Sequence, residues 1–301
     1  MTQNSQSSRL QGVFTALATP MHSGAVDFED LGKLLEHQFA GGIDGLVPVG
    51  TTGESPTLKT SDEHLEVIRQ TVKIADGRVP VIAGVGSNST EEAVHMSLEA
   101  EKAGADALLH VTPYYNKPNQ EGLFQHFSAI AQETELPIVL YSIPGRCVIE
   151  IDIDTVARLY EAHSNISAIK ESGGNPDRVT ALRQKLGSDY TILSGDDGLT
   201  LEFMQNGADG VISVASNIAV TQMAKLMKAI QTGDTAEAQR LDSALQPFFS
   251  SLFLDPNPVP VKHILAKAGI IKSPEVRLPL TPLQKQFVAK LESAYEAIQG
   301  L

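Results

Sequence analysis

The seven residues AGADALL, 103–109, recur in two further versions in this chain, GGIDGLV at 41–47 and NGADGVI at 206–212. In each version a glycine follows a segment of helical periodicity, and a short polar link leads into a run of apolar residues. Glycine readily adopts the left-handed conformation in which many helices end, and short links are typical between the helices and strands of α/β proteins. The three versions therefore predict a chain built from repeated helix-to-strand joints.

Around these joints, short apolar runs alternate with longer segments of helical periodicity. In the segment 27–40, Asp27 suits an N-cap, the apolar residues follow a helical spacing, and Gly41 and Gly42 end the pattern. The apolar runs show no alternation with polar residues, as is typical of parallel strands covered by helices on the outside. We expect strands at 12–20, 45–50, 79–86, 107–113, 136–144, 166–172, 190–195 and 210–216, and helices at 27–40, 63–75, 91–103, 121–132, 153–161, 176–186, 197–204 and 220–230.

This order of strands and helices predicts a closed (β/α)8 TIM barrel. An open doubly wound sheet is the alternative, but no Gly-x-Gly-x-x-Gly turn follows the first strand, as many such sheets would show. Further helical segments at 235–252, 259–268 and 282–298 predict a C-terminal helical appendage. We therefore expect a flexible tail at 1–11, the barrel at 12–232 and a C-terminal helical domain at 233–301.

The composition argues against several classes of function. The 301 residues are 42% hydrophobic and 20% charged, as in globular proteins, and the net charge of −13 argues against binding to nucleic acid or to an anionic membrane. The single cysteine, Cys147, cannot form an internal disulfide. No apolar run is long enough to cross a bilayer, and the first residues have no apolar signal core. We expect a cytoplasmic protein.

Polar residues gather where the predicted strands end, which is where TIM barrels carry their chemistry. The strand predicted at 166–172 ends near Lys170, an unusual residue there because a buried charge is costly. Hydroxyl groups, tyrosines and one arginine occupy the other strand ends, in GTTGES at 50–55, TPYYN at 112–116, YSIPGR at 141–146, SGDD at 194–197 and SVASN at 213–217. No cluster of His, Cys and carboxylates has the spacing of metal ligands.

This set of side chains suits imine chemistry. A lysine in a partly dry site has a lowered pKa, and its free amine can attack a carbonyl group. Tyrosine and threonine hydroxyls can relay the protons that imine formation requires. The guanidinium group of Arg146 can bind a carboxylate through two hydrogen bonds.

Together these motifs resemble the dihydrodipicolinate synthase family of pyruvate-dependent class I aldolases, whose wider relatives include N-acetylneuraminate lyase. The resemblance covers nearly the whole chain, from FTALATPM at 14–21 to DPNPVPVK at 255–262 and RLPLTP at 277–282. Its most specific parts are GTTGES, VTPYYNKPNQEGL at 111–123, YSIPGR, IKES at 169–172 and SGDD.

The resemblance implies that the chain condenses pyruvate with L-aspartate-4-semialdehyde in the diaminopimelate and lysine biosynthesis pathway. It implies that Lys170 forms a Schiff base with pyruvate, and that Tyr141, Thr52 and Tyr115 relay protons. It also implies that Tyr115 is contributed by a neighbouring subunit, within a homotetramer built as a dimer of dimers. The lysine imine is itself the electron sink, so the resemblance implies neither a metal nor an organic cofactor.

For the substrates, the resemblance implies that Thr51 and Thr52 hold the pyruvate carboxylate and that Arg146 receives the carboxylate of the semialdehyde. It also implies contacts of Gly195 and Ile212 with the substrate. Some members of the family are inhibited by L-lysine bound in a pocket at the dimer interface. The positions that match this pocket are Ser55, Pro56, Leu58, Ser61, His64, Asn88, Glu92 and Tyr114. Of these, we predict Ser55, His64, Asn88, Glu92 and Tyr114 as lysine-binding residues.

Several of these residues also have structural interpretations. Lys170 could pair with Glu171, and Arg146 could pair with a surface carboxylate. Glu92 could complete a capping box that begins at Ser89, and His64 could lie on the surface. Thr51 and Thr52 could be capping residues, Tyr114 and Tyr115 interface aromatics, Asp196 and Asp197 an N-cap pair, and Cys147 a buried inert thiol.

Two other functions remain open at this point. One is a sister aldolase or lyase that acts on a sugar acid, which Arg146 argues against because sialic-acid lyases generally lack this arginine. The other is a non-catalytic paralogue that binds a keto acid. Such a paralogue should have lost a residue of the proton relay, and this chain retains all of them.

Overall fold

The computed structural model describes residues 9–58 and 60–301. Most of the tail predicted at 1–11 lies outside the described residues. One sheet contains eight parallel strands in the order β4 (Gly45–Val47), β1 (Gly12–Ala16), β10 (Gly210–Ser213), β9 (Thr191–Ser194), β8 (Ile166–Glu171), β7 (Ile138–Ser142), β6 (Ala107–Val111) and β5 (Ile82–Gly84). A parallel bridge between Leu46 and Val81 joins the two ends of this order. The predicted closed barrel is therefore confirmed, and the open-sheet alternative is wrong.

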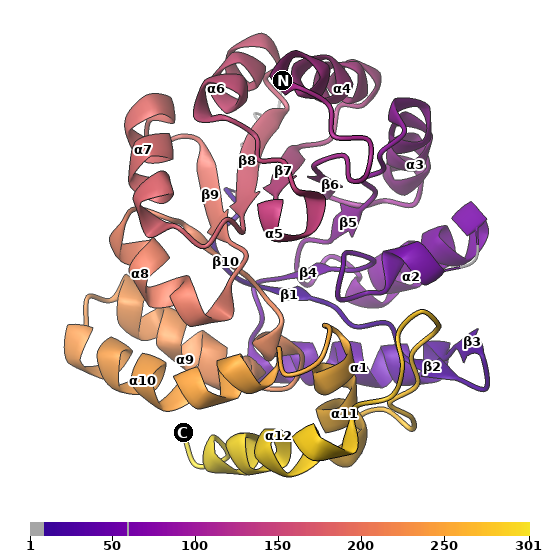
Figure 1. The fold of residues 1–301 in the computed structure, drawn as a ribbon, viewed down its shortest axis with the longest axis vertical. Helices are drawn as coiled ribbons and strands as arrows, with labels where there is room; N and C mark the ends of the chain where they lie inside the picture. Colours follow the sequence, from indigo (N-terminus) through magenta and orange to yellow (C-terminus); the bar gives the residue numbers. More distant parts are fainter. Residues whose placement is uncertain (1–8, 59) are drawn as a thin grey trace.

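Helices surround the barrel, as the alternation in the sequence predicts (Figure 1). They are α1 (Phe28–Gly41), α2 (Thr60–Ala75), α3 (Thr90–Lys102), α4 (Gln120–Glu133), α6 (Ile153–Ala162), α7 (Pro176–Leu186), α8 (Thr200–Gln205) and α9 (Val220–Gln231). The C-terminal helices α10 (Thr235–Ser251), α11 (Val259–Lys267) and α12 (Lys285–Ala297) lie together along one side, in orange and yellow in Figure 1. Leu241 and Leu245 of α10 share one apolar core with the barrel helices. The domain boundary at 232–233 stays a prediction.

Several short elements differ from the predicted ones. The strand expected at 12–20 ends at Ala16, and a hairpin of β2 (Met21–His22) and β3 (Ala25–Val26) follows it. Ser23 and Gly24 both have positive φ, as a tight type I′ hairpin turn requires. Short helical turns also occur at strand ends: α5 (Pro144–Cys147), η1 (Ser55–Thr57), η2 (Asp197–Leu199) and η3 (Ala215–Asn217).

The three repeated joints have the predicted geometry and one further feature. Gly42, Gly104 and Gly207 adopt left-handed φ values of 80°, 87° and 99°. The aspartate that follows each glycine accepts a hydrogen bond from the backbone of a neighbouring strand. The donors are the N–H groups of Val13 to Asp44, Val81 to Asp106 and Ile192 to Asp209, each at 2.8 Å. The joints therefore end helices and also fix where neighbouring strands begin.

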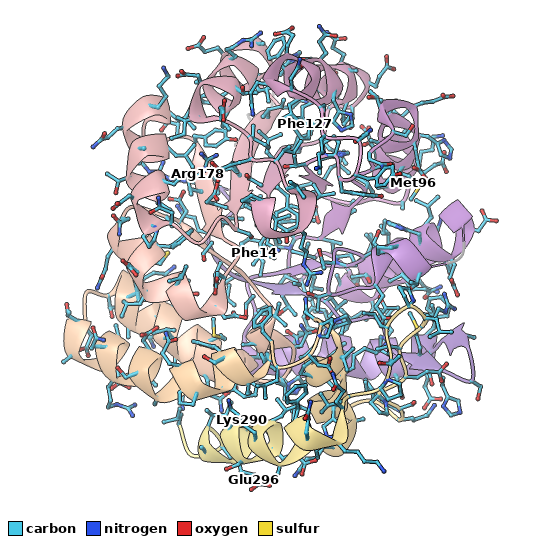
Figure 2. The ribbon with its side chains drawn as sticks, in the orientation of Figure 1. Phe14, Met96, Phe127, Arg178, Lys290 and Glu296 are labelled. Carbon is cyan, nitrogen blue, oxygen red and sulfur yellow. The ribbon has the colours of Figure 1, made fainter. Side chains whose placement is uncertain are left out.

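Alternate residues of the strands face opposite sides of the barrel wall. One apolar cluster fills the interior and includes Phe14, Val139, Tyr141 and Ala168. A second lies between strands and helices and includes Phe127 of α4. Figure 2 shows Phe14 near the centre of the molecule and Phe127 in the outer layer. Because Ala168 faces inward, Lys170, two residues further along β8, faces the same way.

Candidate active site

Lys170 and Tyr141 are neighbours at the carboxyl ends of two adjacent strands. The two residues pair in the register of β7 and β8, and the Nζ atom of Lys170 lies 4.2 Å from the centroid of the Tyr141 ring. The lysine is only 6% exposed, and it forms no ion pair with any residue that the structure describes. The arrangement provides a single buried amine beside a phenol, which is suited to attack on a carbonyl group.

Glu171 faces away from Lys170, toward the helices. Its carboxylate accepts a hydrogen bond at 2.8 Å from Nε of Arg178 on α7, and the same guanidinium reaches Glu150 at 3.1 Å. Burial raises the pKa of Glu171, while the neighbouring Arg178 opposes that shift. The alternative in which Lys170 pairs with Glu171 is therefore wrong, because successive residues of a strand face opposite sides.

Gly195 lies beside the buried lysine, and Ile212 lies inside the barrel. The backbone N–H of Gly195 donates to the carbonyl of Glu171 at 2.8 Å, and a Cβ atom on Gly195 would lie 2.9 Å from Cε of Lys170. The glycine therefore leaves the space that the lysine side chain occupies. Ile212 is fully buried in the interior cluster that also contains Tyr141.

A cavity of about 260 Å³ lies at this end of the barrel. Among the predicted site residues, Thr51, Tyr141 and Arg146 line it, as do Ser55 and Tyr114. Arg146 lies on the short helix α5, which Figure 1 shows over the middle of the barrel. Its side chain is exposed and forms no ion pair within the described residues, so its predicted surface carboxylate partner is wrong.

Thr52 lies in the loop between β4 and η1 and is 2% exposed. Its hydroxyl oxygen accepts a hydrogen bond at 3.0 Å from Nδ2 of Asn257, which precedes α11. Neither Thr51 nor Thr52 is the N-cap of a described helix, since Glu54 precedes η1 and Thr52 bonds to Asn257 instead. No feature of the sequence pattern points to a role for Asn257, although it lies within the DPNPVPVK motif.

A second cavity of about 260 Å³ adjoins the first, and Ser55, Pro56, Gly86 and Tyr114 line both. Four of the five residues predicted for the lysine pocket, Ser55, His64, Glu92 and Tyr114, line the second cavity. Asn88 does not line it, but its Nδ2 donates to the carbonyl oxygen of Tyr114 at 3.1 Å.

Two polar side chains that line this second cavity, buried His64 and exposed Glu92, have defined partners. His64 is 9% exposed, so the surface interpretation is wrong, and burial lowers its pKa. Its Nε2 lies 2.7 Å from the carbonyl oxygen of Gly84, which can only accept, so Nε2 carries the proton. The carboxylate of Glu92 accepts from Ser87 at 2.5 Å, while Ser89 caps α3. The capping box is therefore only half formed, and the Glu92 side chain faces the cavity instead.

Tyr115 lies apart from both cavities in the single chain. It is 90% exposed, with a left-handed φ of 73°, in the loop that follows β6. This left-handed backbone costs free energy for a residue other than glycine.

Asp196 and Asp197 differ from each other in environment. Asp196 caps η2, as predicted, by accepting from the backbone of Gly198. Asp197 is buried and accepts from the backbone N–H groups of Val214 and Ala215 at 2.9 and 2.8 Å. Burial raises its pKa to about 6. Asp197 therefore ties the end of β9 to the end of β10 rather than capping a helix. Cys147 is buried, as predicted, and burial raises its pKa.

Across residues 9–58 and 60–301, no group of three or more His, Cys, Asp or Glu side chains is arranged to hold a metal ion. Nor does any described helix have the length and apolar character needed to cross a membrane.

Comparison with known proteins identifies the family of this fold and site. The family model described as "Dihydrodipicolinate synthetase family" matches residues 9–298. The 4-hydroxy-tetrahydrodipicolinate synthase of Bartonella bacilliformis is 48% identical to this chain, over 91% of the chain and 93% of the relative. The solved 4-hydroxy-tetrahydrodipicolinate synthase of Methylacidiphilum fumariolicum SolV has a TM-score of 0.95 and 50% identity, over 97% of each chain.

Two further similar structures carry small molecules. The chloride-inhibited dihydrodipicolinate synthase of Acinetobacter baumannii, complexed with pyruvate, has a TM-score of 0.92 and 43% identity, over 96% of this chain and 98% of that chain. The enzyme of Cyanidioschyzon merolae, with lysine bound, has a TM-score of 0.92 and 38% identity, over 97% and 99% of the two chains.

Proposed function

The chain belongs to the dihydrodipicolinate synthetase family, and on that premise we propose that Lys170 is the residue that forms the Schiff base with pyruvate. The reaction is that of 4-hydroxy-tetrahydrodipicolinate synthase, a lyase that condenses pyruvate with L-aspartate-4-semialdehyde on the route to diaminopimelate and lysine. The sugar-acid lyase and the non-catalytic paralogue are therefore set aside.

The buried amine of Lys170 beside the ring of Tyr141 is the observation that carries this assignment. The amine attacks the keto carbon of pyruvate, and loss of water gives the imine. The imine withdraws electrons from the neighbouring methyl group, which loses a proton to give an enamine. The enamine carbon then attacks the aldehyde carbon of the semialdehyde. Finally, the amino group of the bound product displaces Lys170 and closes the ring.

The hydroxyl groups of Tyr141, Thr52 and Tyr115 are proposed to carry the protons in these steps. Tyr141 packs against Lys170, and Thr52 lies in the loop that also contributes Thr51 to the first cavity. Tyr115 would complete the relay from a neighbouring subunit, which its exposure in the single chain supports. Each transfer needs a donor and an acceptor within hydrogen-bonding distance.

Carboxylate recognition is assigned to Thr51 and Thr52 for pyruvate and to Arg146 for the semialdehyde. Arg146 lines the first cavity and has no carboxylate partner among the described residues, so its fork of donors is free for a ligand. Gly195 would serve by leaving room for the imine, because a larger residue there would collide with Lys170.

Reduction with borohydride in the presence of pyruvate tests the central assignment. We expect one reduced pyruvate adduct on Lys170, located by peptide mass mapping, and no adduct on Lys262, which is also buried. The Lys170→Ala variant should give no adduct. A folded wild-type protein that remains unmodified at Lys170 would contradict the mechanism.

We also propose that the second cavity binds L-lysine as a feedback inhibitor. The Glu92 carboxylate faces this cavity and can pair with an ammonium group, and His64 also lines the cavity. Lysine should lower the initial rate of the wild type, and Glu92→Gln should weaken that inhibition. Glu91→Gln, which changes an exposed neighbour on the same helix, serves as the control. Initial rates that stay unchanged in saturating lysine would rule out this site.

The assembly and cellular location are proposed from the family premise. A homotetramer built as a dimer of dimers would supply Tyr115 across an interface, and the exposure of this ring in one chain supports that arrangement. A cytoplasmic location, with neither nucleic acid nor membrane as partner, remains our prediction.

A further inference from the structure

The C-terminal segment contacts the 50–57 loop at four points, although the two are more than two hundred residues apart in sequence. One contact joins Nη1 of Arg277 to the carbonyl oxygen of Thr57 at 2.8 Å. Asn257 donates to the hydroxyl oxygen of Thr52 at 3.0 Å, across 205 positions. Lys262 donates to the carboxylate of Glu54 at 2.5 Å, and the backbone N–H of Arg277 donates to the same carboxylate at 3.2 Å. The loop is therefore held from outside the strands that carry it.

The contact between Glu54 and Lys262 fixes the backbone that follows Thr52. Both side chains are 0% exposed, and Glu54 has a left-handed φ of 57°, a conformation that costs free energy for a residue other than glycine. An ion pair without water depends strongly on its geometry, so it holds one arrangement of the loop. Arg277 strengthens this anchor by also binding Glu63 at 2.6 Å.

The contact between Asn257 and Thr52 fixes the direction of a proton. A hydroxyl group can accept hydrogen bonds and can donate one. Since the oxygen of Thr52 accepts from the amide of Asn257, its own proton remains available for another acceptor. Thr52 is 2% exposed and Asn257 is 7% exposed, so water has little access to either group.

We propose that Asn257 is a positioning residue for the reaction: it orients the hydroxyl group of Thr52 so that this group can donate into the proton relay. The inference rests on the proposed role of Thr52 and extends it to a residue of the C-terminal segment. Asn257 lines neither of the two cavities, and within the described residues its side chain has a hydrogen bond to Thr52 and none to Lys170. Its effect on the rate must therefore pass through Thr52.

A double-mutant cycle tests this dependence. We expect Asn257→Ala to lower kcat by roughly 10- to 100-fold, because a displaced catalytic group costs that much. In a Thr52→Val background, which lacks the hydroxyl, Asn257→Ala should have no further effect on kcat, since groups that act as a unit are not additive. Effects that multiply instead would assign Asn257 a separate structural role and would overturn the proposal.

A second variant tests the direction of the proton. In Asn257→Asp the carboxylate can only accept, so the hydroxyl group of Thr52 donates its hydrogen bond to it and no longer to the relay. We expect kcat at alkaline pH to fall at least as far as in Asn257→Ala, with partial recovery toward acidic pH as the new carboxyl group is protonated. A pH profile parallel to that of the wild type would contradict the proposal.

The control is Asn165→Ala. Asn165 lies just before β8, at the opposite end of the barrel, and its Nδ2 donates to the carbonyl oxygens of Ala131 and Thr134 at 3.0 and 2.8 Å. This variant should lower the melting temperature and leave kcat unchanged.

Failure of the proposed function can be distinguished from failure of the role of Asn257, because Thr52→Val would then retain wild-type activity. Failure of the present inference alone would leave Thr52→Val slow and Asn257→Ala as active as the wild type.

Discussion

At the scale of a single residue, the lack of a side chain at Gly195 leaves the space that Lys170 needs. A methyl group at this position would overlap Oγ of Ser172 and lie 2.9 Å from Cε of Lys170. We predict that Gly195→Ala slows borohydride trapping of pyruvate by more than about tenfold, because the amine is displaced from its position. Overpacking should cost about 1–3 kcal/mol of stability, measured by urea unfolding.

The matched control for this prediction is Gly32→Ala on α1. There a new methyl group would meet only Cδ1 of Ile74, at the ordinary contact distance of 3.9 Å. Alanine should stabilise the helix by about 0.5–1 kcal/mol and leave the trapping rate unchanged. A Gly195→Ala protein that forms the imine at the wild-type rate would show that Lys170 has room to adjust.

The placement of individual candidate site residues was predictable from sequence where their position in a strand gave the reason. Lys170, Tyr141 and Arg146 each stand at or just after the end of an apolar run, and barrel geometry brings such ends together. Asn257 could not be found in this way, because its contact with Thr52 depends on how the C-terminal segment packs. The same holds for the partner of Glu171, which lies on a helix rather than at the neighbouring lysine.

At the scale of elements, Arg178 joins α7 to β8 and to the segment that follows α5. Its guanidinium binds the buried carboxylate of Glu171 and also Glu150, and Figure 2 shows the residue in the outer layer of the barrel. We predict that Arg178→Met destabilises the fold by about 3–5 kcal/mol, because a buried carboxylate loses its partner. Urea unfolding measures this loss.

Two further variants isolate the cause. Adding Glu171→Gln to Arg178→Met should restore part of the lost stability, since the unpaired charge is removed. Arg158→Met removes an exposed ion pair with Glu121 and should cost no more than about 1 kcal/mol. Equal losses in Arg178→Met and Arg158→Met would mean that burial of Glu171 adds nothing.

The order of the elements was predictable, whereas several of their ends were not. The three glycine joints indicated where helices stop, and the left-handed φ values agree. The strand predicted at 12–20 was too long because apolar residues continue into the loop that leads to the β2–β3 hairpin. Likewise, Pro144 starts a helical turn that the apolar run up to Ile143 does not reveal, since proline fits the first position of a helix.

Two buried histidines make the contact of β6 with α3 and α4 sensitive to acid. Burial lowers the pKa of His110 from 6.5 to about 3 and that of His126 from 6.5 to about 4. Well above pH 6.5 both histidines are neutral in the folded and in the unfolded chain. In that range a change of pH therefore does not alter the free energy of unfolding through them. As the pH falls below that value, the unfolded chain binds protons that the folded chain excludes.

We therefore predict that stability decreases between about pH 6.5 and pH 4, by up to roughly 1.4 kcal/mol per pH unit for each histidine. Urea unfolding at a series of pH values measures the slope. In His126→Gln the slope should be smaller, because one of the two groups no longer titrates. A slope identical to that of the wild type would place the acid sensitivity elsewhere.

The whole molecule presents Tyr115 outward, 90% exposed, and Val148 beside the active-site segment is 67% exposed. Tyrosine is enriched where two chains meet, because its ring is apolar and its hydroxyl group is polar. If each active site combines Lys170 of one chain with Tyr115 of another, two differently impaired chains can complement each other.

We predict that Lys170→Ala and Tyr115→Phe, each weakly active or inactive alone, regain activity when unfolded and refolded together in equal amounts. Random pairing in a two-fold symmetric dimer gives about a quarter of the sites both residues intact, so activity should approach that share of the wild type. A mixture no more active than the mean of the two separately refolded proteins would show that each chain builds its site alone.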